Sequence, residues 1–419
     1  MKVIIVGGGI GGLATALMCH ARGIDCEVYE QAEQIRELGV GINTLPHAIR
    51  ELAGLGLLDG LDRVGIRTHE LIYMNRLGQE IWREPRGMDA GFDVPQFSIH
   101  RGRLQAVIHQ AVRARLGESR IRTGLRLGSF RQDEAGVTAW FFDRTGAHAH
   151  TARGDVLVGA DGIHSLVRGT LVPQEGPPAW NGIMLWRGAI DWPAFLDGRS
   201  MLIAGGMGAK AVVYPIAEGQ RPGHRLTNWA VAVRQGDGSA PPPRREDWSR
   251  PGRMEELMPH VRRFAVPQID IARLIEATPE FWEYPMCDRD PLPRWSHGRV
   301  TLLGDAAHPM YPVGSNGASQ AILDARCLAD WLVAADHPVH ALWAYERDRL
   351  PVTAEIVRTN RRGGPEGVID AVETLAPDGF ADIEAVLPYE QRKAIVRGYA
   401  AMAGFAREQV NRAAGLRAA

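Results

Sequence analysis

The sequence has few of the residues that crosslink small folds or bind metal. Its 419 residues include only four cysteines. No two of them form a C-x-x-C pair, and no cysteine–histidine cluster has the spacing of a zinc site. We therefore expect reduced thiols, as in cytosolic proteins, and no metal centre. The cysteines are Cys19, Cys26, Cys287 and Cys327.

An excess of either charge is also missing, since 48 basic residues face 49 acidic ones. This balance gives no general attraction to nucleic acid or to an anionic membrane surface. No apolar run approaches the roughly 18 residues that a membrane-spanning helix needs. The N-terminus lacks the charged region and cleavage site of a signal peptide. We therefore expect a cytoplasmic globular protein, a monomer or homodimer, whose partners are small molecules.

What is present begins with a glycine-rich turn. Residues 2–6 (KVIIV) have the composition of a buried strand, and G-x-G-x-x-G follows at Gly7, Gly9 and Gly12. In dinucleotide-binding folds the first glycine permits the tight turn, and the second lets the pyrophosphate approach the backbone. The third lets the helix pack closely on the strand. The pyrophosphate then lies at the positive N-terminus of that helix.

Glu30 supports this interpretation. It ends the next predicted strand, 26–30, near the expected spacing of roughly 20 residues. A carboxylate there accepts hydrogen bonds from both ribose hydroxyls of an adenosine and repels a 2′-phosphate. The site is therefore predicted to prefer FAD or NAD over NADP. A plain glycine-rich turn is the alternative, and the strand–turn–helix–strand context argues against it.

Two later segments place an aspartate directly after an apolar strand: 158–168 (VGADGIHSLVR) and 302–309 (LLGDAAHP). Ligands bind at the carboxyl ends of strands in open α/β sheets. Asp161 and Asp305 are therefore candidate binding residues, and Asp305 is placed to accept a hydrogen bond from a flavin ribityl hydroxyl. The helix after 312–317 would direct its positive end at a flavin ring. The alternative for each aspartate is a helix N-cap.

These motifs, in this order, resemble the single-component flavin aromatic hydroxylases, the 4-hydroxybenzoate and salicylate hydroxylase family. The resemblance extends from residue 3 to about residue 360. Several stretches are most similar to the phenazine-modifying branch of that family. They include 38–43 (LGVGIN), 98–105 (SIHRGRLQ) and 184–188 (MLWRG).

The resemblance implies an α/β fold with a Rossmann-type FAD-binding domain, an inserted domain and a helical C-terminal segment. Strand-like runs between about 180 and 285, with a hairpin near 69–83, predict that the insert is a mostly antiparallel β-sheet substrate domain. Helices are predicted at 46–64, 100–116, 317–335, 340–360 and 380–411. The expected boundaries are 1–68, 98–178 and 286–362 for the FAD-binding domain, 69–97 and 179–285 for the substrate domain, and 363–419 for the C-terminal segment.

The resemblance also implies roles at the cofactor. Arg101 would bind the phosphate or ribityl region of FAD, Asp305 the ribityl chain, and Asp161 would support the fold behind the pyrophosphate. The alternative for Arg101 is a surface salt bridge. The remaining implied cofactor residues are Gly7, Gly9, Gly12, Glu30 and Val40, with Pro312, Gly314 and Asn316 along the ring.

The family's reaction uses NAD(P)H to reduce the flavin. Dioxygen then gives a flavin C4a-hydroperoxide, which hydroxylates an electron-rich ring. The protein must orient that ring and exclude water. We expect a small aromatic or N-heteroaromatic substrate that is phenazine- or salicylate-like. NADH and NADPH stay undistinguished, because no second nucleotide-binding domain is present and none occurs in the family.

Candidate substrate residues lie on the predicted strands of the insert: Trp186, Arg187, Tyr214 and Trp229. Arg187 could pair with a carboxylate, and Tyr214 could hydrogen-bond a substrate oxygen. Tyr214 and Pro312 are the catalytic candidates, and no general base is identified. The alternative is a core position for each aromatic and a structural ion pair for Arg187. At the level of function, the alternative is an FAD-dependent oxidase, dehydrogenase or epoxidase of related fold, or a non-catalytic FAD-binding protein.

Overall fold

The computed structural model describes residues 1–37, 39–206, 208–244 and 250–412. One half of the fold is built on a five-stranded sheet in the order β18-β12-β1-β2-β8, whose pairings are all parallel. The apolar composition of its inner strands suits a parallel sheet, which is buried on both faces. Four of these strands, β1, β2, β12 and β18, are confirmed as predicted before the glycine turn, before Glu30 and before the two aspartate motifs. The strands are β1 (Lys2–Val6), β2 (Asp25–Tyr29), β8 (Ile121–Arg122), β12 (Val156–Gly159) and β18 (Val300–Leu302).

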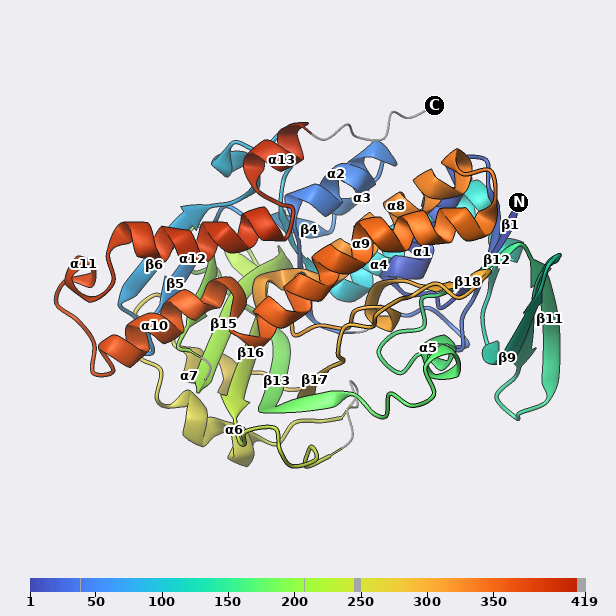
Figure 1. Cartoon of the computed structure of the whole chain (residues 1–419). Coiled ribbons are helices and arrows are strands. Elements are labelled where there is room, and N and C mark those ends of the chain that lie inside the picture. The colour runs from blue at the N-terminus through green and yellow to red at the C-terminus, as the bar shows by residue number, and fades with distance from the viewer. Residues whose placement is uncertain (38, 207, 245–249, 413–419) are drawn as a thin grey trace.

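Helices and a small meander pack around this sheet. Helix α1 lies between α8 and α4, and α9 runs beside α8 (Figure 1). The meander lies next to β1. Its Phe141 stacks on Tyr29 of β2, with 4.1 Å between the ring centroids. The helices are α1 (Ile10–His20), α4 (Arg101–Leu116), α5 (Leu166–Leu171), α8 (Gly317–Ala334) and α9 (Pro338–Arg361). The meander is β9 (Arg126–Asp133), β10 (Gly136–Phe142) and β11 (His148–Gly154).

The insert is a seven-stranded sheet in the order β17-β13-β16-β15-β14-β5-β6. Its pairings are antiparallel except for β14 with β5, so the expected mostly antiparallel sheet is confirmed. Helices α6 (Met254–Val261) and α7 (Ile271–Glu276) cover one face of it. The strands are β5 (Glu70–Met74), β6 (Glu80–Pro85), β13 (Ala179–Pro193), β14 (Met201–Ala204), β15 (Ala209–Glu218), β16 (His224–Arg234) and β17 (Phe281–Asp288).

A third sheet has three strands in the order β3-β7-β4. Along the chain, β3 and β4 fall between β2 and β5, and β7 falls between β6 and β8. The single helix expected over 46–64 is two helices, because Gly56 has a left-handed φ of +70° and breaks it. The elements are β3 (Gly41–Thr44), α2 (Pro46–Gly54), α3 (Leu58–Asp62), β4 (Gly65–Arg67) and β7 (Phe97–His100). Short 3-10 turns are η1 (Gly87–Ala90), η2 (Glu118–Arg120), η3 (Gly304–Ala306), η4 (Val313–Ser315) and η5 (Gly364–Glu366).

The C-terminal segment folds back over the insert. Its helices α10 and α12 bury apolar side chains against β5, β6 and β14. The helix expected over 380–411 is three helices, interrupted at Pro388 and at Gly404, whose φ is +81°. The helices are α10 (Gly367–Leu375), α11 (Ile383–Val386), α12 (Tyr389–Met402) and α13 (Arg407–Arg412). Residues 413–419 of the predicted segment lie outside the described residues, and the three predicted boundaries stay predictions.

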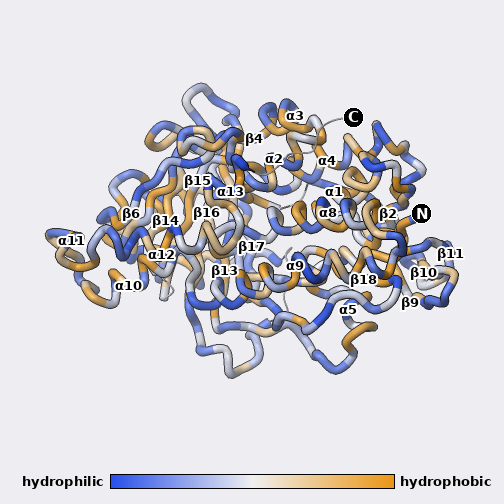
Figure 2. Tube along the Cα trace, turned by 45° about the horizontal axis from the view of Figure 1, so that its top comes forward, coloured by the Kyte–Doolittle hydropathy of each residue, from blue (hydrophilic) through white to orange (hydrophobic). Residues whose placement is uncertain are grey.

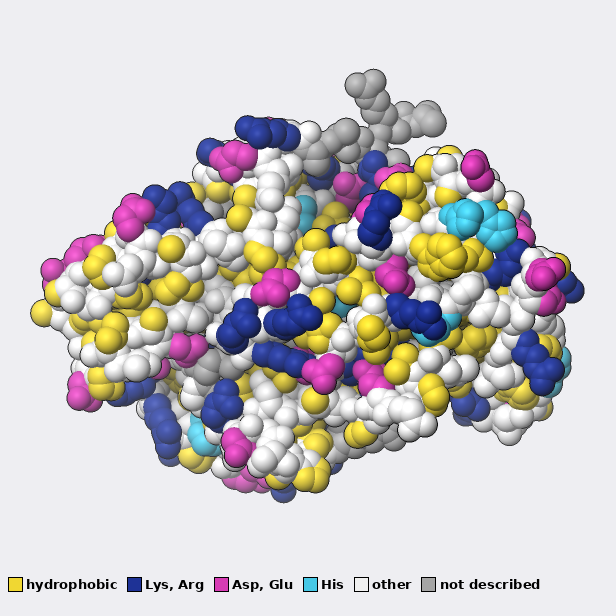
Figure 3. All heavy atoms as spheres, viewed as in Figure 1, with side chains coloured by type: hydrophobic (Ala, Val, Ile, Leu, Met, Phe, Trp, Pro, Cys, Tyr) yellow, Lys and Arg dark blue, Asp and Glu magenta, His cyan; other side chains and the backbone are white. Residues whose placement is uncertain are grey.

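Hydrophobic segments concentrate in the strands of the insert and in the central helices (Figure 2). On the face in Figure 3, basic and acidic side chains are interspersed, in keeping with the net charge of −1. No helix among the described residues has the length and hydropathy to cross a bilayer. The described residues also contain no group of three or more His, Cys, Asp or Glu side chains arranged to hold a metal ion.

Candidate active site

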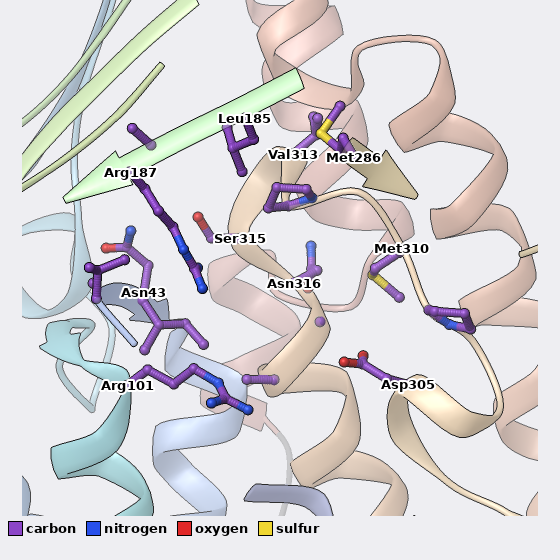
Figure 4. A pocket seen from close by; sticks show the side chains of 18 of the residues that line it. Asn43, Arg101, Leu185, Arg187, Met286, Asp305, Met310, Val313, Ser315 and Asn316 are labelled. Carbon is purple, nitrogen blue, oxygen red and sulfur yellow. The ribbon is translucent and has the colours of Figure 1, made fainter. Parts of the chain in front are cut away.

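A cavity of about 340 Å³ lies where the carboxyl ends of the parallel strands meet the insert sheet. This size is typical of small-molecule sites. Arg101 and Arg187 extend into it from one side, and Asp305 lies across from them (Figure 4). Of the predicted site residues, eight line the cavity: Gly9, Val40, Arg101, Arg187, Tyr214, Asp305, Pro312 and Asn316.

The glycine turn is shaped by close backbone contacts. Gly7 has φ +109°, and a Cβ there would lie 2.3 Å from the carbonyl oxygen of Ala160. A Cβ on Gly12 would lie 2.0 Å from the carbonyl oxygen of Gly7. A Cβ on Gly9 would meet nothing within 4 Å, because Gly9 borders the cavity. Gly7 and Gly12 thus make the turn, while Gly9 keeps it open to a ligand.

Glu30 braces this turn from the end of β2. Its Oε2 accepts a hydrogen bond from the amide of Gly8, and its Oε1 accepts one from the amide of Ala32, both at 2.7 Å. A carboxylate oxygen accepts more than one hydrogen bond, so ribose hydroxyls can still bind there. The side chain does not line the cavity itself.

The brace leads to a paired prediction. Glu30→Ala should weaken FAD binding by about ten- to a hundredfold, because charge-assisted hydrogen bonds contribute roughly 1.5–3 kcal/mol each. Glu33→Ala should leave the affinity unchanged, since Glu33 is exposed and lies 3.7 Å from Arg144. Titration of the apoproteins with FAD, followed by flavin fluorescence, measures both. Equal losses at the two positions would contradict an adenosine-binding role for Glu30.

The two motif aspartates differ in their surroundings. Asp161 accepts hydrogen bonds from the hydroxyl of Ser165 and from the amides of Leu166 and Val167, so it caps α5. Asp305 accepts none from the described residues, and its carboxylate opens onto the cavity. Enclosure by the surrounding protein raises the pKa of Asp305, and His308 and Arg101 partly offset this rise. Asp161 therefore helps to cap α5 beside the N-cap residue Ser165, and the ligand interpretation fits Asp305.

Arg168 connects the two aspartate motifs. It is almost fully buried and donates from Nη1 to the carbonyl oxygens of Ala306 and Ala307, at 3.0 and 2.8 Å. Its guanidinium also pairs with Glu175. These bonds hold the backbone immediately after Asp305 in place. Sequence reasoning quoted Arg168 as the last residue of its motif and gave it no role.

Arg101 begins α4, and its amide donates to the carbonyl oxygen of Val40 at 2.9 Å. Its guanidinium has no hydrogen-bond partner among the described residues and faces the cavity. Burial, with the positive charge of Arg187, lowers the pKa of Arg101, and Asp305 opposes that shift. Because the Arg101 guanidinium faces the cavity, it is better placed to bind an anionic ligand than to form a surface salt bridge.

The loop before α8 bends sharply at the cavity. Gly314 and Ser315 are both left-handed, with φ of +65° and +57°. The amide of Gly314 donates to Glu366 at 3.1 Å, and the Asn316 amide group donates to the hydroxyl of Tyr399 at 2.9 Å. The C-terminal segment therefore fixes the conformation of this loop through hydrogen bonds. Pro312 and Asn316 reach the cavity, whereas Gly314 does not line it.

The expectation that Trp186 and Trp229 line the substrate pocket requires correction. Both are fully buried on the opposite face of the insert sheet, against α6 and α7. The Nε1 of Trp186 donates to Glu283 at 3.0 Å, and that of Trp229 donates to Thr278 at 2.8 Å. Successive residues on a strand point to opposite faces, so Trp186 turns away where Arg187 faces the cavity.

Several cavity residues escaped sequence reasoning. The Oδ1 of Asn228 accepts from the amide of Gly41 at 2.8 Å and joins the insert to β3. Strand periodicity could have found Lys210, which lies four residues before Tyr214 and so on the same face. No sequence signal marks Glu366, because tertiary packing brings it in. Other missed residues are Asn43, Leu185, Met201, Val212, Ala230, Ala232, Tyr284, Met286 and Met310.

These residues fit a flavin dinucleotide. The open backbone at Gly9 and the N-terminus of α1, which has no side-chain cap, provide amide donors for a pyrophosphate. The side chains of Arg101 and Asp305, which have no hydrogen-bond partner among the described residues, provide a cation and an acceptor further along the cavity. Fold and site together define a flavoprotein with a separate substrate sheet.

Comparison with known proteins gives the family. The FAD binding domain family matches residues 1–360, and the chain belongs to it. Phenazine 1,6-dicarboxylic acid hydroxylase PhzS of Lysobacter antibioticus is 44% identical over 363 residues, 86% of this chain and 89% of that protein. 3-Hydroxybenzoate 6-hydroxylase 1 of Aquipseudomonas alcaligenes is 32% identical over 369 residues, covering 86% and 88%. The chain is an FAD-dependent aromatic monooxygenase.

Solved structures share the fold. Klebsiella pneumoniae HpxO, complexed with FAD and uric acid, superposes with a TM-score of 0.73 at 24% identity. The match covers 98% of this chain and 96% of that one. The expected fold class, a Rossmann-type half with an inserted sheet and C-terminal helices, is confirmed.

Proposed function

We propose that this enzyme uses NAD(P)H and dioxygen to hydroxylate a planar, electron-rich aromatic or N-heteroaromatic compound that carries at least one phenol or carboxylate group. A phenazine-like substrate is favoured, since the 44% identical relative is named as a phenazine hydroxylase. The observation that carries the proposal is the cavity face of the insert sheet, which is largely apolar and flanked by polar side chains.

Strand register defines that face. Arg187 on β13 pairs with Ala230 on β16, which pairs in turn with Val212 on β15. One row away, Leu185 pairs with Ala232. The alanines on the central strand leave room for a flat ring between longer side chains, and few polar groups face it, as in other small-molecule sites.

The flanking side chains suit such a ring. Arg187, whose guanidinium lies 5.0 Å from the ring centroid of Tyr284, can pair with a substrate carboxylate. The Tyr214 hydroxyl can hydrogen-bond a substrate oxygen as a neutral donor, because burial raises its pKa. We assign Arg187 and Tyr214 to substrate binding.

Bound FAD supplies hydride acceptance and oxygen transfer. The protein supplies the surroundings. Gly9 and the N-terminus of α1 would bind the pyrophosphate, and Val40, Arg101 and Asp305 would lie along the rest of the cofactor. The N-terminus of α8, behind Pro312 and Asn316, favours negative charge at the ring. The apolar side chains that line the cavity exclude water and hold the aromatic substrate against the loop before α8.

A substrate panel tests the proposal. Phenazine carboxylates, salicylates, hydroxybenzoates and hydroxypyridines should be incubated with enzyme, NAD(P)H and oxygen-18 gas, and products analysed by mass spectrometry. We expect at least one aromatic to gain a labelled hydroxyl and to stimulate NAD(P)H oxidation. NAD(P)H consumption alone is insufficient, because uncoupled turnover yields only hydrogen peroxide. Dehydrogenation of an alcohol or amine without any labelled aromatic product would replace the proposal with a flavin oxidase or dehydrogenase.

A further inference from the structure

Lysine is rare in this chain. Only Lys2, Lys210 and Lys393 occur among the 48 basic residues, so arginine supplies nearly every cation. The side chains of Lys2 and Lys393 are 34% and 35% exposed, whereas that of Lys210 is 10% exposed. One of the three lysines is thus buried at the wall of the active cavity.

Lys210 has one acceptor among the described residues. Its ammonium pairs with Glu366, which comes from the C-terminal segment and also accepts the amide of Gly314. Burying two charges is costly, and such a pair is weak evidence for stability. A lysine ammonium has three N–H donors, and Glu366 takes one of them. The other donors remain for a ligand, because Lys210 lines the cavity.

The sheet places Lys210 across from Arg187. Lys210 on β15 pairs with Ala232 on the central strand β16, and Arg187 on β13 pairs with Ala230. Two strand spacings, about 10 Å, separate β13 from β15. Arg187 and Lys210 therefore stand on opposite sides of the alanine floor, on the same face of the sheet.

We propose that Lys210 is a second anion-recognising residue of the substrate site, held in position by Glu366. The site then selects planar aromatics that carry an acidic or acceptor group at each end, one for Arg187 and one for Lys210. This inference rests on the proposed function and adds a specificity residue to it. Glu366 is a positioning residue, because it acts through Lys210.

Lysine scarcity makes a direct test practical. Enzyme loaded with FAD and labelled with carbon-13 at lysine Cε should give three lysine signals, and Lys210→Met identifies the buried one. Phenazine, phenazine-1-carboxylate and phenazine-1,6-dicarboxylate serve as probes. We expect the dicarboxylate to shift the Lys210 signal and neutral phenazine to leave it in place.

Binding measurements give the second readout. Lys210→Met should weaken the dicarboxylate by about ten- to a hundredfold, as expected for one charge-assisted hydrogen bond, and the monocarboxylate much less. Lys210→Arg should restore part of the loss. Lys393→Met, on the exposed side of α12, is the matched control and should bind both as wild type does. Glu366→Gln should shift the Lys210 signal without ligand and reduce the preference for the dicarboxylate.

Each outcome discriminates. Equal dicarboxylate affinity in Lys210→Met and wild type, with FAD retained, would overturn the role of Lys210 and leave the proposed function intact. A wild-type enzyme that binds the monocarboxylate more tightly than the dicarboxylate would do the same. If no phenazine binds and the oxygen-18 panel yields no hydroxylated aromatic, the proposed function fails and the inference falls with it.

Discussion

Gly9→Ala should weaken FAD binding roughly ten- to a hundredfold in an intact fold, whereas Gly12→Ala should damage the fold itself. A Cβ on Gly9 projects into the cavity and meets no protein atom within 4 Å, so the apoprotein tolerates it. The residue has φ −72°, which alanine adopts without strain. The added methyl occupies space that the pyrophosphate needs. Over-packing of this kind costs about 1–3 kcal/mol, or roughly ten- to a hundredfold in Kd.

Gly12→Ala meets a different obstacle. Its Cβ would lie 2.0 Å from the carbonyl oxygen of Gly7, a backbone atom that cannot move aside without opening the turn. We expect loss of both FAD and thermal stability. Circular dichroism melts of the two apoproteins, with FAD titrations, separate the cases. A Gly9→Ala protein that keeps FAD at wild-type affinity would show that the pyrophosphate does not approach this residue.

Asp305→Ala should release FAD with little effect on the apoprotein. The carboxylate accepts no hydrogen bond from the described residues, so its removal leaves none of their donors unpaired. In the loaded enzyme it would lose one or two charge-assisted hydrogen bonds, on the order of 1.5–3 kcal/mol each. Flavin content after dialysis and Kd from fluorescence titration measure the effect.

Asp161→Ala provides the matched control. Asp161 accepts from the amides of Leu166 and Val167 at the start of α5, and loss of such capping bonds costs about 1 kcal/mol of stability. We expect this variant to melt at a lower temperature and to keep most of its FAD affinity. If Asp305→Ala lowers the melting temperature of the apoprotein as much as Asp161→Ala does, Asp305 is structural as well.

The sequence predicted the cofactor half of the site better than the substrate half. The turn at Gly7 to Gly12 and the aspartates at strand ends depend on local backbone geometry, which spacing reveals. The substrate face depends on which side of each strand meets the cavity. Trp186 and Arg187 are neighbours on one strand, so they could not both face the cavity, but either side was chemically suitable for a ring. The packing of α6 and α7 places Trp186 on the covered face of the sheet and leaves Arg187 facing the cavity.

The contribution of the C-terminal segment could not be predicted at all. Glu366 and Tyr399 reach the loop at Gly314 only because α10 and α12 fold back over the insert sheet. Helical periodicity indicated helices there, but it carries no information on which distant surface they cover. Contacts of this kind come from tertiary packing.

The order of strands in the parallel sheet has a consequence for how the enzyme is made. β1 is translated about 150 residues before its neighbour β12 and about 300 residues before β18. Unpaired strand edges on a nascent chain invite wrong pairing. The loop at Gly314 also depends on Glu366 and Tyr399, which are translated after it. We therefore expect the cofactor site to reach the geometry described here only after the C-terminal helices have been made.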